Sequence, residues 1–397
     1  MIMIGSGPSR DEERAARLGA HLRVELLTMG PGVETYSRFG HSALRVTDRR
    51  GVGDIVFNFG TFDHEDPAVV SKFLSGTLRY WLSVSTYAET RREYRGEKRR
   101  LIAQQLRLTP LQRRQLFTRL YALSQPDKRN YRYHHFHANC STKIRDVLDE
   151  ALGGAMRRQL SARPAHTYRH WLRRATGGAP FFHLGFDLVL TRADGRISTW
   201  EACFAPEQLM RAMEVTRVPA DGRVRPLSLV SSTRVLLPGP DFGAAGGPAP
   251  WTVVLVVAWL LLVLAVAPLV FRPSSRWAWR LTGGVLGLWG LITTASSLLV
   301  IYVWSFSSLP VFAGNQNLAL LPPTGLAWII LGAILVVRPP PPWLLRWLLA
   351  LSGLHALIAV VYTGARVFGL ADQGNTPLLA ATVPWALAIV WILHRAR

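Results

Sequence analysis

A cysteine and a histidine, far apart in the chain, have the surroundings that best suit nucleophilic chemistry. Cys140 follows an aromatic and histidine-rich stretch, and a helical pattern of apolar residues begins beside it. Backbone N–H groups and the helix dipole at a helix start favour the thiolate, which is the reactive form of cysteine. His41 opens an alternating run that indicates a strand. The two residues could therefore be the nucleophile and base of an acyl-transfer site.

Other interpretations of these residues stay open. Cys140 could be a small packed side chain at a helix start, with no chemical role. His134, His135 and His137 could bind zinc together with Cys140, although their spacing matches no standard zinc pattern. Cys203 is flanked by apolar residues and is predicted to be buried. In an oxidising compartment a disulfide between the two cysteines would remove the nucleophile.

The chain is long and strongly basic. It has 397 residues and a formal net charge of +21, from 46 Lys and Arg against 25 Asp and Glu. A basic protein could bind nucleic acid, but no helix-turn-helix, zinc-finger or RNA-binding signature is present. Residues 251–397 consist mainly of long apolar stretches, which indicate a membrane domain. We therefore expect the basic surface to face anionic phospholipid headgroups, and we expect no nucleic acid partner.

Periodicity and turn signals predict the elements that must position the two residues. We expect a polar segment over residues 1–20 and then a mixed α and β domain over residues 21–237. Within it, residues 41–47 and 54–59 are predicted to form a hairpin. Further strands are expected at 22–28, 77–85 and 101–108, and helices at 67–75, from Pro110 after the cap Thr109, at 167–174 and at 205–215. Residues 238–250, rich in Gly and Pro, are predicted to be a linker.

Five apolar stretches follow, and their lengths predict membrane-spanning helices. They are 251–271, 281–304, 318–337, 343–364 and 378–394. Arginines lie in the first and third connections and at the C-terminus, whereas the second connection, SFSSLPVFAGNQNLALL, carries no charge. Arginine-bearing connections are expected in the cytoplasm, and five spans with a cytoplasmic C-terminus then place residues 21–237 on the outer side of the membrane. Residues 1–20 contain no continuous apolar signal region, so we expect an upstream leader or export driven by the first span.

Several segments together resemble the periplasmic domain of the Lnb family of bacterial lipoprotein N-acyltransferases. They are GHSALRV, VFNFGTFD, YRYHHFHANCSTKIRD and GFDLVLTRADGRISTWEACFAPEQL. The uncharged loop GNQNLALLPP and the multi-span C-terminus also resemble the membrane portion of this family. The resemblance covers most of the chain from about Leu22. It implies an α+β fold: a circularly permuted papain-like cysteine domain, similar to NlpC-type peptidases and lecithin:retinol acyltransferase, followed by a bundle of about five transmembrane helices.

The resemblance also implies roles for individual residues. Cys140 would be the nucleophile and His41 the base. The strand after the histidine strand usually carries the third, orienting group, for which Asn58 is the best-placed residue and Asp63 and His64 are competitors. Further candidates, which would shape the site or its oxyanion hole, are Asn139, Ser141 and Asp146. Asp146 could equally form a structural ion pair with Arg145. No cofactor or metal is implied.

The implied activity is transfer of an acyl chain from a phospholipid, through a Cys140 thioester, to the α-amine of a diacylglyceryl-cysteine lipoprotein N-terminus. The partners would be phospholipid, lipoprotein and the bilayer of the bacterial inner membrane. One alternative is a membrane-anchored cysteine peptidase or amidase that acts on cell wall or peptide. Another is a membrane protein that binds a ligand without chemistry. Several spans favour lipid handling over cell-wall hydrolysis, and few intramembrane charges argue against ion transport.

Overall fold

The computed structural model describes residues 9–51, 53–191, 193–219, 225–242, 250–338 and 341–396. The chain divides into two compact units. The sheet unit consists of Met1–Thr176 and Gly195–Ala245, and the helical unit consists of Gly177–Asp194 and Gly246–Arg397. The predicted linker at 238–250 lies largely outside the described residues.

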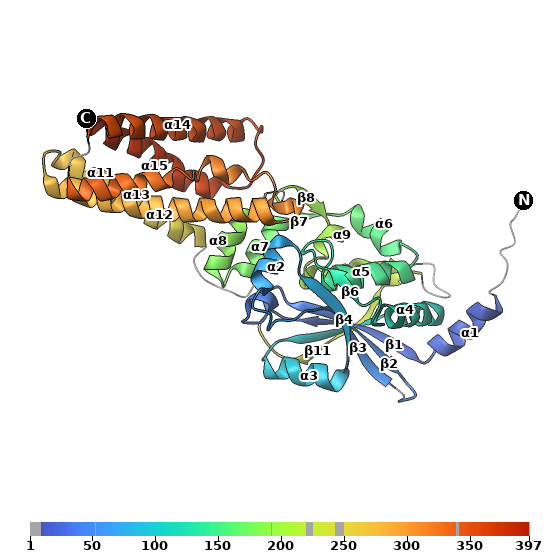
Figure 1. Cartoon of the computed structure of the whole chain (residues 1–397). Helices are drawn as coiled ribbons and strands as arrows, with labels where there is room; N and C mark the ends of the chain where they lie inside the picture. Colours follow the sequence, from blue (N-terminus) through green and yellow to red (C-terminus); the bar gives the residue numbers. More distant parts are fainter. Residues whose placement is uncertain are drawn as a thin grey trace, which may run out of the picture. The chain divides into compact units, whose positions relative to one another are not determined.

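In the described part of the sheet unit, seven antiparallel strands form one sheet in the order β11-β5-β1-β2-β3-β4-β6 (Figure 1). Their bounds are β1 Leu22–Met29, β2 His41–Asp48, β3 Gly53–Thr61, β4 Arg79–Thr86, β5 Leu101–Leu106, β6 Asn130–Arg132 and β11 Val230–Leu237. The predicted hairpin is confirmed, because β2 pairs with β3 and places Leu44 opposite Phe57. Strand β2 therefore lies near the centre of the sheet, between β1 and β3.

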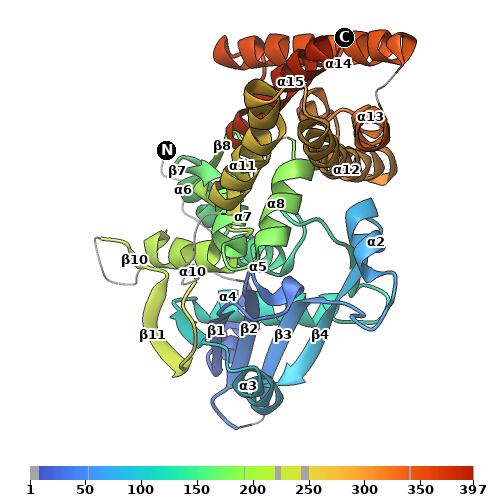
Figure 2. The same cartoon turned by 90° about the vertical axis from the view of Figure 1, so that its left-hand side faces the viewer.

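Helices cover both faces of this sheet (Figure 2). On one side lie α4 (Pro110–Leu123), α5 (Cys140–Ala151) and α10 (Pro206–Val215), and on the other lies α3 (Tyr87–Gly96). Each face of the sheet has its own hydrophobic core, and successive residues of β1 pack into different ones. Leu26 packs with the first group of helices, and Leu27 packs with Tyr94 of α3. Strands buried on both faces give nearly continuous apolar runs, which explains the sequence LRVELLTM.

Side-chain capping fixes where α4 and α5 begin. Thr109 accepts from the backbone N–H of Gln112, and Pro110 is the first residue of α4, as predicted. Asn139 caps α5 by accepting from the backbone N–H of Thr142. The remaining elements of this unit are α1 Arg10–Gly19, α2 Val69–Ser75, α6 Ala155–Ser161, α7 Tyr168–Thr176, α9 Thr199–Ala202, β7 Pro164–Thr167, β8 Arg196–Ser198, β9 Arg217–Val218 and β10 Leu227–Ser228.

The helical unit contains α8 and five apolar helices that follow the linker. Their bounds are α8 Pro180–Val189, α11 Pro250–Phe271, α12 Arg276–Phe306, α13 Gly325–Val337, α14 Pro342–Val367 and α15 Thr376–Arg395. Among the described residues, four helices are long and apolar enough to cross a membrane, namely α11, α12, α14 and α15. The prediction of five spanning helices is therefore corrected. With 13 residues, α13 is about 20 Å long, whereas the hydrocarbon core of a bilayer is about 30 Å thick.

The shortness of α13 has a local cause. Pro322 and Pro323 precede it and prevent the helix from starting earlier. The chain before them forms only two short 3₁₀ helices, Pro310–Phe312 and Gln316–Ala319. Phe312 and Leu321 are nevertheless buried, as backbone outside regular α-helices must be within a membrane domain. Helix α13 packs closely on α12, where a Cβ added to Gly283 would lie 2.7 Å from the carbonyl oxygen of Gly332.

The end of α13 lies beside the start of α12. The Arg280 side chain donates to the carbonyl oxygen of Val336 at 3.2 Å, and Arg276 donates to the neighbouring carbonyl of Val337. The short helix therefore returns the chain to the arginine-bearing side of the unit.

Residues 177–194 pack with the helical unit, although the sequence predicted one continuous domain from 21 to 237. The last carbonyls of a helix have no intrahelical partner. At the end of α8, the Asn315 and Asn317 side-chain amides donate to the carbonyl of Leu188 at 2.8 and 2.9 Å, and Gln373 donates to that of Leu190 at 3.2 Å. Asn315 and Asn317 of the uncharged loop, together with Gln373 before α15, thus supply hydrogen bonds that hold the end of α8.

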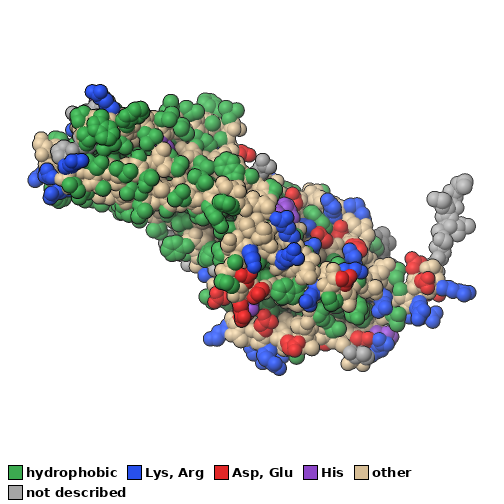
Figure 3. All heavy atoms as spheres, viewed as in Figure 1, with side chains coloured by type: hydrophobic (Ala, Val, Ile, Leu, Met, Phe, Trp, Pro, Cys, Tyr) green, Lys and Arg blue, Asp and Glu red, His purple; other side chains and the backbone are tan. Residues whose placement is uncertain are grey.

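Hydrophobic side chains cover the visible face of the helical unit, and Lys and Arg gather at one end of it (Figure 3). Large exposed apolar residues include Leu260, Leu291, Leu357 and Val361. A continuous apolar surface of this kind is unusual for a monomer in water. It suits the hydrocarbon of a bilayer, so we treat the helical unit as a membrane domain.

Candidate active site

Cys140 and His41 meet at the end of the sheet. Cys140 is the first residue of α5, and His41 is the first residue of β2. Their side chains are hydrogen-bonded to each other. Both flank Gly60, where an added Cβ would lie 3.2 Å from the Cβ of Cys140 and 3.4 Å from Cε1 of His41. With φ of +95°, Gly60 also has a backbone conformation that favours glycine. The close approach of the pair therefore depends on a missing side chain.

Asn58 is the predicted third group that contacts His41. Its Oδ1 lies within hydrogen-bonding distance of Nε2 of His41. When Nε2–H donates to this oxygen, Nδ1 is the ring nitrogen left for Cys140. The competitors Asp63 and His64 are exposed, and the Asp63 carboxylate accepts from the backbone N–H of Glu65 at 3.1 Å. The geometry thus singles out Asn58 among the three candidates.

The electrostatics of the pair favour ionisation of the thiol. Burial raises the pKa of Cys140, but the charge and hydrogen bond of His41, the backbone N–H of Ser42 and the hydroxyl of Ser141 together lower that pKa to about 7. Burial lowers the pKa of His41, whereas Cys140 and Asn58 raise it, and the net shift is upward. A thiolate beside an imidazolium is therefore accessible near neutral pH.

Two other predicted site residues hold the nucleophile in place. The Asn139 amide donates to the carbonyls of His135 and Phe204, both at 2.8 Å, while its oxygen accepts from Thr142 N–H at 2.9 Å. Both amide hydrogens are thus in use, and none is left for a substrate. Ser141 is buried, and its hydroxyl oxygen lies 3.1 Å from that of Ser42. These contacts fix the start of α5 against the loop before it and against β2.

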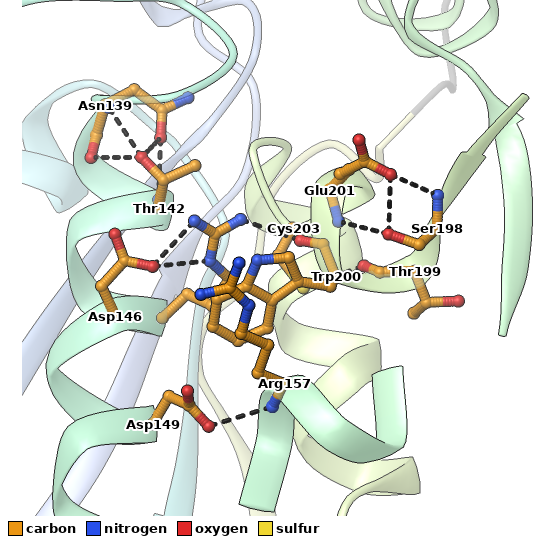
Figure 4. A network of polar contacts seen from close by, with 11 residues as sticks. Asn139, Thr142, Asp146, Asp149, Arg157, Ser198, Thr199, Trp200, Glu201 and Cys203 are labelled. Atoms are coloured by element: carbon orange, nitrogen blue, oxygen red, sulfur yellow. Dashed lines mark hydrogen bonds and ion pairs between the residues drawn. The ribbon is translucent and has the colours of Figure 1, made fainter. Parts of the chain in front are cut away.

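Asp146 lies in a separate polar network (Figure 4). Its carboxylate accepts from Nε and Nη2 of Arg145 at 2.9 and 2.7 Å. The guanidinium stacks 4.0 Å from the centroid of the Trp200 ring and donates to the Trp200 carbonyl at 2.9 Å. Six positions after Cys140, Asp146 points to a different face of α5. These contacts connect α5 to α9. They support the alternative that Asp146 forms a structural ion pair with Arg145.

The second cysteine and the histidine cluster have other surroundings. Both cysteines are free, so the disulfide alternative is wrong. Cys203 is buried, its thiol donates to the carbonyl of Thr199 at 3.2 Å, and burial raises its pKa to about 12. Nδ1 of His135 is hydrogen-bonded to the Tyr133 hydroxyl at 2.8 Å. Within the described ranges, no three His, Cys, Asp or Glu side chains are placed to hold a metal ion.

Ser42 and Gly60 were not among the predicted site residues, although both lie in the segments GHSALRV and VFNFGTFD. Ser42 directly follows His41, and its backbone N–H bonds to the Cys140 sulfur. Gly60 ends the run VFNFG, where a glycine after alternating residues signals a close backbone approach. That signal was present in the sequence, but the approaching partner comes from a helix that begins 80 positions later.

One of three comparisons with known proteins found a match. Residues 15–174 match the family model described as the Lnb N-terminal periplasmic domain. This range contains His41, Asn58 and Cys140. No curated protein and no solved structure matches the chain.

Proposed function

Because the chain belongs to the Lnb family, we propose that it is a lipoprotein N-acyltransferase with Cys140 as its nucleophile. The observation that carries the proposal is the hydrogen-bonded Cys140–His41 pair, in which the thiol pKa is lowered to about 7. A group with this pKa is substantially ionised near neutral pH, as a nucleophile for acyl transfer requires.

The first half-reaction would load the enzyme. The Cys140 thiolate attacks an ester carbonyl of a phospholipid, and His41 holds the proton that left the thiol. When the tetrahedral intermediate collapses, the imidazolium gives this proton to the departing lysophospholipid oxygen. Asn58, bonded to Nε2 of His41, keeps the ring oriented through both steps. The product is an acyl thioester on Cys140.

The second half-reaction would pass the acyl chain to the acceptor. The α-amine of a diacylglyceryl-cysteine lipoprotein N-terminus attacks the thioester, and His41 accepts a proton from the attacking nitrogen. Collapse then releases the Cys140 thiolate and forms an amide. A covalent intermediate suits two bulky lipid substrates, because they need not occupy the site together.

The order of elements supports a permuted papain-like arrangement for the sheet unit, since the histidine strand β2 precedes the cysteine helix α5. The family description supports a periplasmic location for this unit. The arginines beside the start of α12 and the end of α13 support a cytoplasmic location for that end of the membrane domain. We therefore propose the inner membrane as the location and membrane phospholipid as the donor.

The proposal is tested in bacterial cells that lack other N-acylation activity, with mass spectrometry of lipoprotein N-termini. The wild type and the control Cys203→Ala, which changes the buried cysteine, are expected to add the acyl mass. Cys140→Ala is expected to leave the α-amine free. Full N-acylation by Cys140→Ala would exclude the proposed mechanism. A cysteine peptidase or amidase would leave the N-termini unmodified with every variant.

A further inference from the structure

Tyr131 carries a hydroxyl group that is buried in the sheet unit. Its oxygen is buried and accepts from the backbone N–H of Gly60, but its own O–H has no acceptor among the residues that the structure describes. A buried O–H group without an acceptor opposes folding. A phenylalanine would fill the same space without this penalty, so packing alone does not account for the hydroxyl.

The ring of Tyr131 lies close to β3, which carries Asn58, and to α5, which begins with Cys140. Its centroid lies 6.3 Å from that of Phe59, the residue before Gly60. The Lys143 ammonium lies 5.0 Å from the same centroid. Lys143 is three positions after Cys140 and thus shares its face of α5. Tyr131 therefore lies between the end of β3 and the first turn of the cysteine helix.

Attack of a thiolate on an ester places negative charge on the carbonyl oxygen, and acyl-transfer enzymes stabilise this charge with hydrogen-bond donors. The backbone N–H of Cys140 is one donor, because the first N–H groups of a helix have no intrahelical acceptor. Asn139, Ser141 and Asp146 were the candidates for shaping the oxyanion hole. The two amide hydrogens of Asn139 bind the carbonyls of His135 and Phe204, the Ser141 hydroxyl pairs with that of Ser42, and Asp146 accepts from Arg145. We therefore looked for a side-chain donor elsewhere around Cys140.

We propose that the Tyr131 hydroxyl is this donor and binds the oxyanion formed on Cys140. The inference rests on the proposed function. In the step, the carbon–sulfur bond forms and the carbonyl π electrons move to oxygen, which accepts hydrogen bonds from Tyr131 O–H and Cys140 N–H. When the carbon–oxygen bond to the leaving alcohol breaks, His41 supplies the proton to that alcohol. Tyr131 keeps its own proton throughout.

The protonation state of the phenol fits this role. Burial and the nearby charge of Cys140 raise the pKa of Tyr131 well above its ordinary value. The hydroxyl thus remains a donor over the whole pH range in which the thiolate forms.

Two reactions of the same cysteine test the role in the full-length protein in detergent micelles. p-Nitrophenyl octanoate acylates Cys140 through an oxyanion, and the burst of nitrophenolate reports the rate. Iodoacetamide alkylates the same thiolate at a saturated carbon, so no oxyanion forms. Tyr131→Phe is expected to slow acylation by about 10²–10³-fold and to leave the alkylation rate and its pH profile unchanged.

Tyr133→Phe is the matched control, because the rings of Tyr131 and Tyr133 both contact that of Tyr80. The hydroxyl that this variant removes is already bonded to His135. It is expected to acylate at the wild-type rate. Wild-type acylation by Tyr131→Phe would overturn the inference and leave the proposed function standing. Equal losses in acylation and alkylation would also overturn it, since the hydroxyl would then act on the thiolate. Absence of a burst in the wild type would overturn the proposed function itself.

Discussion

The hydroxyl oxygens of Ser42 and Ser141 lie 3.1 Å apart in the core of the sheet unit. Ser42 directly follows His41, and Ser141 directly follows Cys140. One buried hydrogen bond thus joins the strand that carries the base to the helix that carries the nucleophile. It adds to the bond from the Ser42 backbone to the Cys140 sulfur. The two halves of the site are positioned by their immediate neighbours.

Ser141→Ala is expected to reduce the free energy of unfolding by about 1–3 kcal/mol, because it leaves the buried Ser42 hydroxyl without a partner. Chemical denaturation in detergent measures the loss. The double variant with Ser42→Ala is expected to lose less than the sum of the two single variants, since both polar groups are then absent. Strictly additive losses would show that the two hydroxyls are not coupled.

The alkylation rate of Cys140 by iodoacetamide is expected to rise with pH through a midpoint near 7, because only the thiolate reacts. His41→Ala removes a positive charge and a hydrogen bond that favour the thiolate, while burial remains. The midpoint is therefore expected to move above the ordinary value of about 8.5. Rates measured from pH 5 to pH 10 check both statements. An unchanged midpoint in His41→Ala would mean that the imidazole does not control the thiol.

Gly60→Ala is expected to abolish acylation, since the added Cβ would lie 3.2 Å from the Cβ of Cys140 and 3.4 Å from His41. Gly51→Ala is the matched control. Its φ of +82° is equally unfavourable for alanine, but nothing lies within 4 Å of an added Cβ. Both variants are expected to lose roughly 1 kcal/mol of stability from the backbone conformation, but only Gly60→Ala is expected to displace Cys140 and His41 and to stop the nitrophenolate burst. Retained activity in Gly60→Ala would show that Cys140 and His41 can move apart without loss of acylation.

In the membrane domain, Gly283→Val is expected to separate α13 from α12, because even a Cβ at Gly283 would lie 2.7 Å from the Gly332 carbonyl. Gly284→Val, at the next position, is the control, as an added Cβ there meets nothing within 4 Å. Thermal unfolding in micelles is expected to show a lowered Tm for Gly283→Val alone. A similar Tm for both variants would argue against the close glycine contact as the basis of this packing.

Local signals in the sequence predicted most of the sheet unit. Alternation gave the hairpin of His41–Thr47 with Asp54–Phe59, capping gave the helix start at Pro110, and apolar spacing gave the helix after Asn139. Each of these depends on residues within a few positions of one another. The pairing of Cys140 with His41 also followed from their separate local contexts, together with the family resemblance.

The features that the sequence did not predict depend on contacts between segments that are far apart in the chain. Helix α8 belongs to the helical unit because amides such as Asn317, more than 120 positions later, bind its terminal carbonyls. Hydropathy assigned the apolar residues before Pro322 to a span, although the chain there forms a short 3₁₀ helix, Gln316–Ala319, and not the start of α13. The role of Gly60 depends on the approach of another element, which no pattern within β3 reveals.

The most direct test of the account is detection of an acyl thioester on Cys140. The purified full-length protein is incubated with a phospholipid that carries an isotopically labelled acyl chain, and its peptides are analysed by mass spectrometry before and after treatment with hydroxylamine. We predict a labelled acyl group on the Cys140 peptide that hydroxylamine removes and that His41→Ala does not form. An unmodified Cys140 peptide, in a preparation that still N-acylates a diacylglyceryl-cysteine peptide, would contradict the account.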